Sequence, residues 1–590
     1  MRILLIALVL AFPYVSANGQ SWEAAIRGQQ QVITLFLTDL QESFAFLAEE
    51  EQQTYIARYR YNLDMHRGFC YQFSDRYPEL AGDALNLTLA TKGMILQTGR
   101  EMRRTILQSG DTAAISLFNE WTELKDKLAD QYSLPEQKRL QGLPKMEKRA
   151  IQYEKDLYRI AASYNGLPDL LGVRWEDVRA ALPDQHVAVE FSHFRYFDGE
   201  HWTDSLLYVA FVLRRDMPWP VMVRLGEEKE ISSILLAKKD QPTIDRVNYL
   251  YGFPEPDMDD PDDMAGQRLY ALIWKKIEPF LQPGDTIHVA PSGWLHLLNP
   301  SAIPFDYDHV LADRYTFEWT STTGLLATAS DSTAAVVAGK LLLFGGINYE
   351  QKATAAAIGI SNGALPETMM EPGVSRGANW KYLPGTRAEV NAIAEMAANK
   401  ALDVQVFKDE MATEEAFNAL SGNVEGAIIH IATHGFFLEN QREEPADNAF
   451  TVAENPLLRS GLLMAGAAPS WRGEQTTEGK DGILTALDIA NSDLTGVPLV
   501  VLSACNTGMG TMDDGEGLYG LQRAFRMAGT DYLLMTLWEV PDAQTARFMQ
   551  ELYSHLLETN DVQRAFTTAR ELIRSNYPAP YYWGAFVLTR

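Results

Sequence analysis

The spacing of apolar residues changes twice along the chain and divides it into three parts. From Trp22 to Tyr164, apolar residues recur every three or four positions among Leu, Ala, Glu, Gln and Arg, as in ISLFNEWTELKDKLADQY. That spacing places apolar side chains along one face of successive helices. It predicts an α-helical domain over residues 18–165, similar to a degenerate helical repeat although no fixed period is present. Such a domain suits scaffolding or the docking of an activating protein partner.

Residues 166–335 alternate strands with helices. The runs HVAVEFSHF, LLYVAFVL, WPVMVRL and TIHVAP predict strands, and QRLYALIWKKIEPFL has the spacing of an amphipathic helix. A loop rich in Asp and Pro, PEPDMDDPDDM, interrupts the series at residues 254–264. The pattern predicts an α/β layer in which no chemistry stands out.

Residues 336–590 alternate strands and helices more regularly. The predicted strands are KLLLFGG (340–346), DVQVFK (403–408), GAIIHIATH (426–434), VPLVVLSAC (497–505) and DYLLMTLW (531–538). Among the helices, TRAEVNAIAEMAA begins with Thr386 and Glu389 as a capping box, and GLYGLQRAFRMA places Leu518, Leu521 and Phe525 on one face. Strands rich in Val, Ile and Leu and separated by helices indicate a largely parallel sheet covered on both faces. The predicted fold class is therefore α/β.

One long stretch, from Leu438 to Lys480, interrupts this alternation. It contains the acidic piece ENQREEPADNAF and a candidate hairpin around PLLRSGLLMAGA. Because loops of this length usually carry a function or are disordered, we expect a lid or a processing site here.

The first residues have the layout of a secretory signal peptide. Arg2 precedes an apolar run from Ile3 to Phe12, and small residues end at Ala17, so residues 1–17 predict a cleaved signal and an exported protein, periplasmic or secreted. A buried N-terminal strand or helix is the alternative. Ten apolar residues are too few to cross a bilayer and no later stretch is long enough, so no membrane span is expected.

Charge and cysteine content narrow the class of partner. The chain has 78 acidic against 51 basic residues and a net charge of −27, which excludes a nucleic-acid surface and favours a cationic partner. Only two cysteines are present, Cys70 and Cys505, too few for a disulfide framework. The alternative is a single disulfide between Cys70 and Cys505, which an exported protein could form.

Two histidines, His430 and His434, lie four positions apart in AIIHIATHGFF. On a helix this spacing would suit a metal, but Ala427 to Ile429 is a β-type run, and four strand residues separate the rings by about 13 Å. No metal site is therefore expected. His430 lies within the predicted strand and is expected to be structural, whereas His434 lies at the carboxyl end, where parallel sheets collect ligands.

Cys505 ends the next predicted strand, before a glycine-rich turn. If the strands of His434 and Cys505 are neighbours, about 4.8 Å apart, imidazole and thiol emerge side by side, and a thiol beside a histidine is an activated nucleophile. A small buried cysteine is the structural alternative. A phosphatase-type loop would need an arginine where Thr511 stands, and a phosphate-binding glycine loop would need Lys-Ser or Lys-Thr after Gly517. No cofactor is expected.

The motifs HIATHGFF, VVLSACNTGMG, GEGLYGLQRAFRMAGTDYLLMTLWEV and YYWGAFVL resemble the CHAT domain, part of the caspase–separase group of cysteine peptidases. The resemblance runs from GKLLLFGG to the C-terminus and extends more weakly upstream, through WEDVRAAL, AVEF and APSGWLHLLNPSAIP. It implies a caspase-like parallel-sheet α/β/α sandwich. Residues 166–335 would be its catalytically silent half and residues 336–590 its catalytic half.

The resemblance also implies an activity, that of a cysteine endopeptidase acting on a protein or peptide substrate. The Cys505 thiolate would attack the peptide carbonyl, His434 would carry the proton, and the backbone N–H groups of Gly435 and Cys505 would form the oxyanion hole. Asp542 stands 37 residues after the cysteine, where separase has an aspartate that lines the pocket for a basic P1 side chain.

Two alternatives remain open at this point. Asp542 follows a proline and could simply cap a helix, although Asp513, Asp514 and Glu516 add negative charge that favours a basic P1 residue. The alternative to an enzyme is a catalytically silent scaffold that keeps the caspase-like fold for regulated protein–protein interaction.

Overall fold

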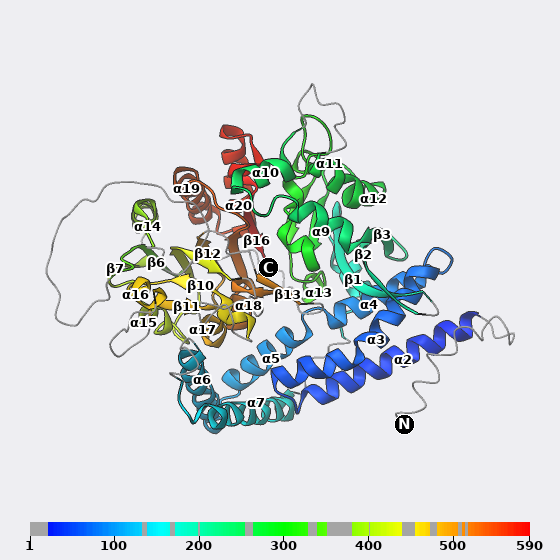
Figure 1. The fold of residues 1–590 in the computed structure, drawn as a ribbon, viewed down its shortest axis with the longest axis horizontal. Coiled ribbons are helices and arrows are strands. Elements are labelled where there is room, and N and C mark those ends of the chain that lie inside the picture. The colour runs from blue at the N-terminus through cyan, green and yellow to red at the C-terminus, as the bar shows by residue number, and fades with distance from the viewer. Residues whose placement is uncertain are drawn as a thin grey trace.

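The computed structural model describes most of the chain in one continuous arrangement of sheet and helices (Figure 1). The described residues are 22–132, 139–165, 172–198, 201–253, 264–328, 339–350, 380–400, 402–438, 455–472, 481–504, 510–513 and 517–590. The predicted signal segment, Cys505 and most of the long stretch after Leu438 lie outside them.

A single sheet runs through both α/β parts of the chain. Its strand order within the described residues is β3-β2-β1-β4-β5-β16-β15-β12-β8-β6-β7. The strands are β1 (His186–Phe197), β2 (Trp202–Arg214), β3 (Val221–Glu227), β4 (Thr286–Ala290), β5 (Thr316–Trp319), β6 (Lys340–Ile347), β7 (Asp403–Asp409), β8 (Ala427–Ala432), β12 (Leu499–Ser503), β15 (Tyr532–Thr536) and β16 (Phe586–Thr589). The predicted α/β class with a largely parallel sheet, preceded by helices, is confirmed.

The strand β16 joins the two parts of the sheet. It pairs with β5 in parallel through Thr589 and Trp319, and with β15 antiparallel over four residue pairs. Since β4 is parallel to β5 and β12 is parallel to β15, the two parallel sets run in opposite directions. Their carboxyl ends therefore lie at opposite edges of the sheet, and the edge that carries His434 belongs to the second set alone.

Helices cover both faces of the first part of the sheet. In β1, Val187 and Val189 belong to the main core, which includes residues of α9 (Glu228–Leu236), α10 (Thr243–Tyr251), α11 (Ala265–Leu269) and α12 (Lys275–Ile277). Ala188 and Phe194 belong to a second core that includes Phe69 and Leu85. A strand with apolar neighbours on both faces has to be apolar at successive positions, which explains the run HVAVEF.

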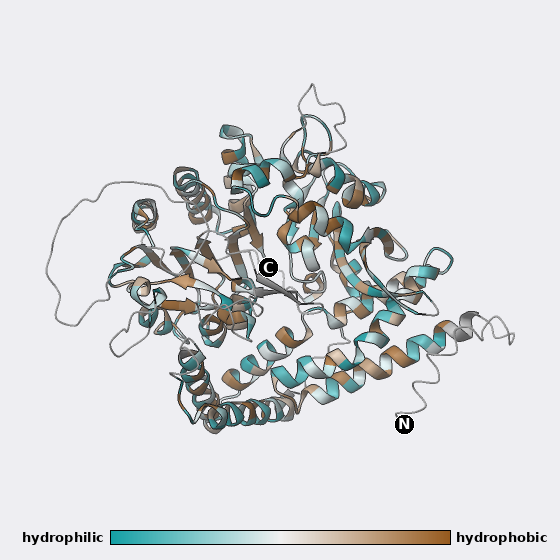
Figure 2. Cartoon of the chain, in the orientation of Figure 1, coloured by the Kyte–Doolittle hydropathy of each residue, from teal (hydrophilic) through white to brown (hydrophobic). Residues whose placement is uncertain are grey.

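The N-terminal helices form an extended layer along the lower side of the molecule in Figure 1. They are α2 (Trp22–Phe44), α3 (Glu49–Phe73), α4 (Glu79–Thr91), α5 (Met94–Gln108), α6 (Thr112–Tyr132) and α7 (Leu143–Asn165), followed by α8 (Trp175–Ala181). Figure 2 shows apolar residues concentrated on the strands, while these helices alternate between apolar and polar stretches. Their apolar stripes are explained by packing against the sheet and against one another.

Two cationic side chains attach this helical layer to the two α/β parts. The partly buried Lys92 ammonium group pairs at 2.5 Å with Glu190, within β1, and donates at 3.0 Å to the carbonyl of Ala290, the last residue of β4. The buried Arg103 guanidinium, on α5, donates to the Ser492 carbonyl and, at 3.0 Å, to the Ala490 carbonyl. The helices thus share contacts and core with the α/β parts, and the boundaries predicted at residues 165 and 335 stay predictions.

The second part of the sheet is also covered on two sides. Figure 1 shows α14 (Pro384–Ala398), α19 (Asp542–Thr559) and α20 (Val562–Asn576) above the strands, and α17 (Ala486–Asn491) and α18 (Leu521–Ala528) below them. Among the described helices, none combines the length and the apolar character needed to cross a membrane.

Three local predictions were wrong. The helix α14 begins at Pro384, so Thr386 is not its N-cap; the Thr386 hydroxyl accepts the Gly346 N–H at 2.9 Å instead, and Glu389 is buried. Residues 517–520 form the strand β14, so Leu518 precedes α18. The stretch PLLRSGLLMAGA forms no hairpin of its own, because its strand β10 (Ser460–Leu463) pairs with β9 (Gly435–Phe437) and β11 (Ile483–Thr485).

Candidate active site

His434 lies directly beyond the carboxyl end of β8, between that strand and β9. Its carbonyl accepts the Leu463 N–H at 3.0 Å, which ties this position to β10. The sequence reaches this geometry because the apolar run Ala427–Ala432 is buried throughout, and Gly435 then opens a strand of a second small sheet. The histidine is thus held at the junction of two sheets.

The strands that precede His434 and Cys505 are neighbours, which meets the condition that the sequence analysis set. They pair in parallel, with Ala432 opposite Ser503. Beyond this pair, the Thr433 N–H donates to the Ser503 carbonyl at 3.3 Å, and the Thr536 hydroxyl donates to the Ala504 carbonyl at 2.7 Å. Cys505 is the next residue and lies outside the described residues. The paired residues Ala432 and Ser503 therefore each stand two positions before a candidate residue in the sequence, His434 after one and Cys505 after the other.

The His434 imidazole is half-buried among two aromatic rings and one carbonyl. Its ring centroid lies 5.1 Å from that of Tyr349 and 5.0 Å from that of Trp380. The Nε2 atom lies 2.8 Å from the Lys381 carbonyl oxygen, which can only accept, so Nε2 carries a proton. A neutral imidazole in this tautomer leaves Nδ1 as its free lone pair, and no described residue forms a hydrogen bond to Nδ1.

The surroundings of His434 shift its pKa. Burial lowers the pKa of His434, because the charged imidazolium loses solvation, and the hydrogen bond to the Lys381 carbonyl opposes this in part. The neutral form is consequently favoured in the resting protein. A neutral imidazole is the form that can accept a proton from a thiol.

His430 lies in a different environment, inside the core, as the sequence predicted. Its Nδ1 atom lies 3.2 Å from the Tyr553 hydroxyl, and its Nε2 atom lies 2.8 Å from Glu389 Oε1, a close contact without the alignment of a full hydrogen bond. His430 and Glu389 are both buried. Within the described part of the chain, no three His, Cys, Asp or Glu side chains are grouped so as to hold a metal ion.

Asp542 is the first residue of α19 and does not cap it. The N-cap is Pro541, and no side-chain capping hydrogen bond is present. The Asp542 carboxylate lies against Gly385, whose added Cβ would come 3.2 Å from Oδ2. Gly385 stands four residues after Lys381, so the segment that contacts His434 also reaches Asp542, within about 14 Å of chain.

Negative charge accumulates around Asp542. Both Asp542 and Glu539 are exposed, yet neighbouring atoms remove part of their solvation. This partial desolvation, and then the charge of Glu389, raise the pKa of Asp542, while partial desolvation and the charge of Asp542 raise the pKa of Glu539. The structure describes no hydrogen bond to the Asp542 side chain. The side chain of Asp513 and the whole of Asp514 and Glu516 lie outside the described residues.

Three residues at the site were not predicted from the sequence: Tyr349, Trp380 and Lys381. They belong to the ends of the segments that follow β6 and precede α14, more than 50 residues before His434. Two of them contribute a ring and one contributes only its carbonyl oxygen. A backbone group has no residue signature, so no sequence motif could have marked Lys381.

The chain is an α/β protein whose candidate site lies at the carboxyl ends of two neighbouring parallel strands, β8 and β12. The chain belongs to the CHAT domain family, whose model matches residues 263–590. The resemblance stated from the motifs is therefore confirmed. The match begins before β4, so it includes β4, β5 and the whole second part of the sheet.

Curated relatives match a smaller part of the chain. It is 26% identical over 250 residues to mouse (Mus musculus) tetratricopeptide repeat protein 28, covering 41% of this chain and 10% of that protein. The human (Homo sapiens) protein of the same name is 26% identical over 277 residues, covering 45% of this chain and 10% of that protein. The chain thus spans about a tenth of the length of these relatives.

Two solved structures have a similar arrangement over a larger part of the chain. The separase–securin complex of Saccharomyces cerevisiae has a TM-score of 0.42 at 9% identity, covering 96% of this chain and 40% of that one. Gingipain R, described as an Arg-specific cysteine proteinase, has a TM-score of 0.31 at 10% identity, covering 61% of this chain and 74% of that one.

Proposed function

We propose that this protein is a cysteine endopeptidase in which Cys505 is the nucleophile and His434 the proton carrier. The observation that carries the proposal is the parallel register of β8 and β12, in which Ala432 lies opposite Ser503, two positions before His434 and Cys505 in the sequence. The occupied Nε2 atom of His434 supports it further, because the free Nδ1 lone pair can accept the thiol proton.

The proposed reaction proceeds in two steps. The Cys505 thiolate forms a C–S bond to the substrate carbonyl carbon, and the carbonyl electron pair moves to oxygen, where the N–H groups of Gly435 and Cys505 stabilise it. When the C–N bond breaks, the His434 imidazolium gives its proton to the leaving amine. A water molecule, deprotonated by His434, then hydrolyses the thioester and restores the thiol.

A peptide library tests the proposal. Purified protein is incubated with a mixed library, and cut sites are read by mass spectrometry. Cuts made by the wild type should disappear in Cys505→Ala and in His434→Gln. Cys70→Ala is the matched control, because Cys70 is buried in α3, among the N-terminal helices, and its loss should leave the cut sites unchanged. If the wild type cuts nothing that Cys505→Ala spares, the peptidase proposal fails and the scaffold alternative remains.

We propose in addition that Asp542 favours Arg or Lys at P1. The support is its contact with the segment of Lys381, the absence of a capping role, and the raised pKa values of Asp542 and Glu539, which a substrate cation would lower. Asp542→Asn should lower kcat/KM for peptides with Arg or Lys at P1, with Glu558→Gln, an exposed carboxylate near the far end of the same helix, as the control. Preferred cleavage after Asp would contradict this assignment.

The predicted export and docking roles are also proposals. The signal-like layout of residues 1–17 supports export, and Edman sequencing of the mature protein after full-length expression should start at Asn18. The helical layer supports the docking of an activating protein, since it contacts the first part of the sheet through Lys92 and the helix α17 through Arg103. A deletion of these helices would expose both cores, so binding is better tested on the full chain.

A further inference from the structure

We propose that Tyr349 and Trp380 are positioning residues that hold the His434 imidazole in the orientation needed for proton transfer. The inference rests on the proposed peptidase function, which it deepens. In that orientation Nε2 donates to the Lys381 carbonyl and Nδ1 remains for the thiol. The two rings come from segments far from each other and from His434 in sequence, so only the fold brings them together.

The Tyr349 ring is fixed by a directed chain of hydrogen bonds. The Thr433 hydroxyl donates its single proton to the Leu463 carbonyl, so the Tyr349 hydroxyl, 3.1 Å away, must donate to Thr433. The Tyr349 carbonyl accepts the Ala468 N–H at 2.9 Å. Thr433 directly precedes His434, so the phenol is anchored to the same backbone that carries the imidazole.

The Trp380 ring is fixed by packing. Its centroid lies 5.4 Å from that of Trp471 in an edge-to-face arrangement, and Trp471 packs in turn on Phe436 at 5.0 Å. The Trp380 indole N–H is buried and has no hydrogen-bond partner among the described residues.

The two rings act on the charge state of the imidazole. They exclude water from the ring, which favours the neutral imidazole and agrees with the lowered pKa of His434. The groups that face His434 are the Tyr349 phenol, the Trp380 indole and the Lys381 carbonyl, and no charged side chain of the described residues contributes to the shift.

The test measures the imidazole itself and therefore does not depend on turnover. His434 is titrated by NMR of its Cε1–H in a Cys505→Ala background, and its signal among the ten histidines is assigned from a His434→Gln spectrum. Trp380→Leu opens the ring to water and should raise the His434 pKa by about half a unit or more. Trp380→Phe keeps an aromatic face and should keep the pKa near that of the parent.

Further variants keep the test decisive if Trp380→Leu does not fold. Tyr349→Leu should also raise the His434 pKa, whereas Tyr349→Phe, which loses only the hydroxyl, should do so less. The matched control is Tyr382→Leu, an exposed tyrosine two residues after Trp380 whose hydroxyl accepts from Arg387 at 2.7 Å. A His434 titration that is the same in Trp380→Leu or Tyr349→Leu as in Tyr382→Leu overturns the proposal.

Activity provides a second readout that separates this inference from the proposed function. In an active protein, Trp380→Leu should lower kcat more than it raises KM and should move the acid limb of kcat/KM to higher pH, and Trp380→Phe should restore both. Equal losses in the Leu and Phe variants would contradict a positioning role. If the wild type has no peptidase activity, the proposed function fails, while the NMR titration still decides whether the rings position His434.

Discussion

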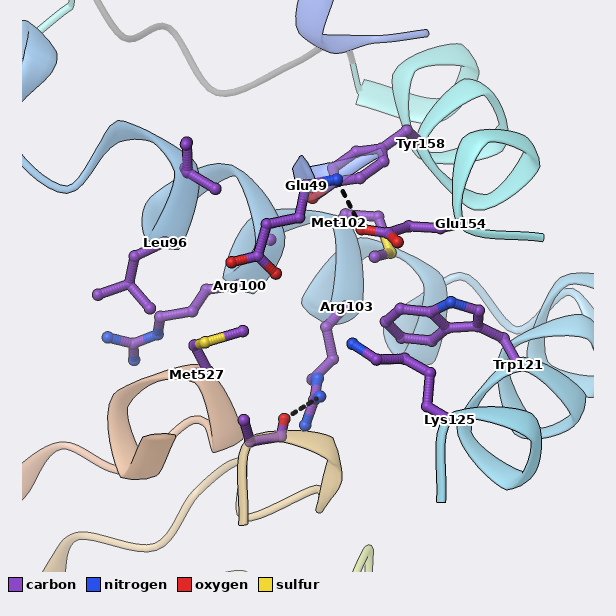
Figure 3. Close-up of a pocket in the computed structure, with 13 residues that line it drawn as sticks. Glu49, Leu96, Arg100, Met102, Arg103, Trp121, Lys125, Glu154, Tyr158 and Met527 are labelled. Atoms are coloured by element: carbon purple, nitrogen blue, oxygen red, sulfur yellow. Dashed lines mark hydrogen bonds between the residues drawn. The ribbon is translucent and has the colours of Figure 1, made fainter. Parts of the chain in front are cut away.

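Replacing Arg103 by Met tests how the helical layer is held against the second α/β part of the chain. Figure 3 shows Arg103 extending from α5 across a small cavity to the end of α17, in a setting that also contains Glu49, Lys125 and Glu154. Its guanidinium donates to the carbonyls of Ser492 and Ala490, the last turn of α17 and the residue that follows it. Arg103 is only 6% exposed, so water cannot replace these hydrogen bonds.

The expected cost follows from the two hydrogen bonds that are lost. A hydrogen bond to a charged group contributes about 1.5–3 kcal/mol, and the relief of guanidinium desolvation offsets part of the sum. We therefore expect the Met variant, which keeps most of the apolar stem, to weaken the contact by about 2–4 kcal/mol. Because about 1.4 kcal/mol is a tenfold change, amide exchange that reports local opening of α17 should accelerate roughly 30- to 1,000-fold.

Hydrogen exchange followed by mass spectrometry measures this effect on the full chain, without assuming two-state unfolding of a large protein. The neighbouring Arg104 supplies a matched control, since its guanidinium pairs with Glu101 at 2.7 Å on the surface. Such a pair contributes under about 1 kcal/mol, so Arg104→Met should leave the protection of α17 almost unchanged. Equal protection in the two variants would refute the reasoning.

Three further outcomes are expected. Burial raises the pKa of Glu154 to about 7, above its unfolded value of 4.5. The stability of the folded protein should therefore fall as pH rises from 4.5 to about 7, because the folded state holds this proton more tightly than the unfolded state. In Glu154→Gln, which has no such proton, the melting temperature should fall less over the same pH range. Burial also raises the pKa of the Cys70 thiol, so iodoacetamide should label only Cys505 in the native protein and both cysteines after unfolding, as read by mass spectrometry. Gly346 has a φ of +61°, and a Cβ there would come 2.8 Å from a side chain of α14, so Gly346→Ala should cost about 1–3 kcal/mol in denaturant unfolding, whereas Gly142→Ala, in open space, should cost little.

The elements around His434 were predictable because burial on both faces imposes a simple pattern. The run AIIHIA is buried at every position, and so is LVVLS in the neighbouring strand. The change from such a run to Gly435 marks a strand end, which is why His434 could be placed at the carboxyl edge and His430 within the core. The adjacency of the two strands was only a condition at the sequence level, and the fold supplies it.

The remaining parts of the site depend on contacts that local patterns do not encode. Thr386 resembled an N-cap because Glu389 follows it by three residues. The helix begins instead at Pro384, and the Thr386 hydroxyl accepts a hydrogen bond from the Gly346 N–H. Glu389 instead lies beside His430 in the core. The role of Lys381 rests on a carbonyl oxygen, which every residue has, so its position could only be learned from the fold.

The position of β16 has a consequence for the synthesis of the chain. Phe586–Thr589 lies between β5 and β15 and pairs with both. Until these residues have left the ribosome, two strand edges inside the future sheet are open at the same time, one in each part. Open edges are templates for pairing with other chains, so a product that stops shortly before Phe586 should aggregate rather than persist as a slightly weakened protein.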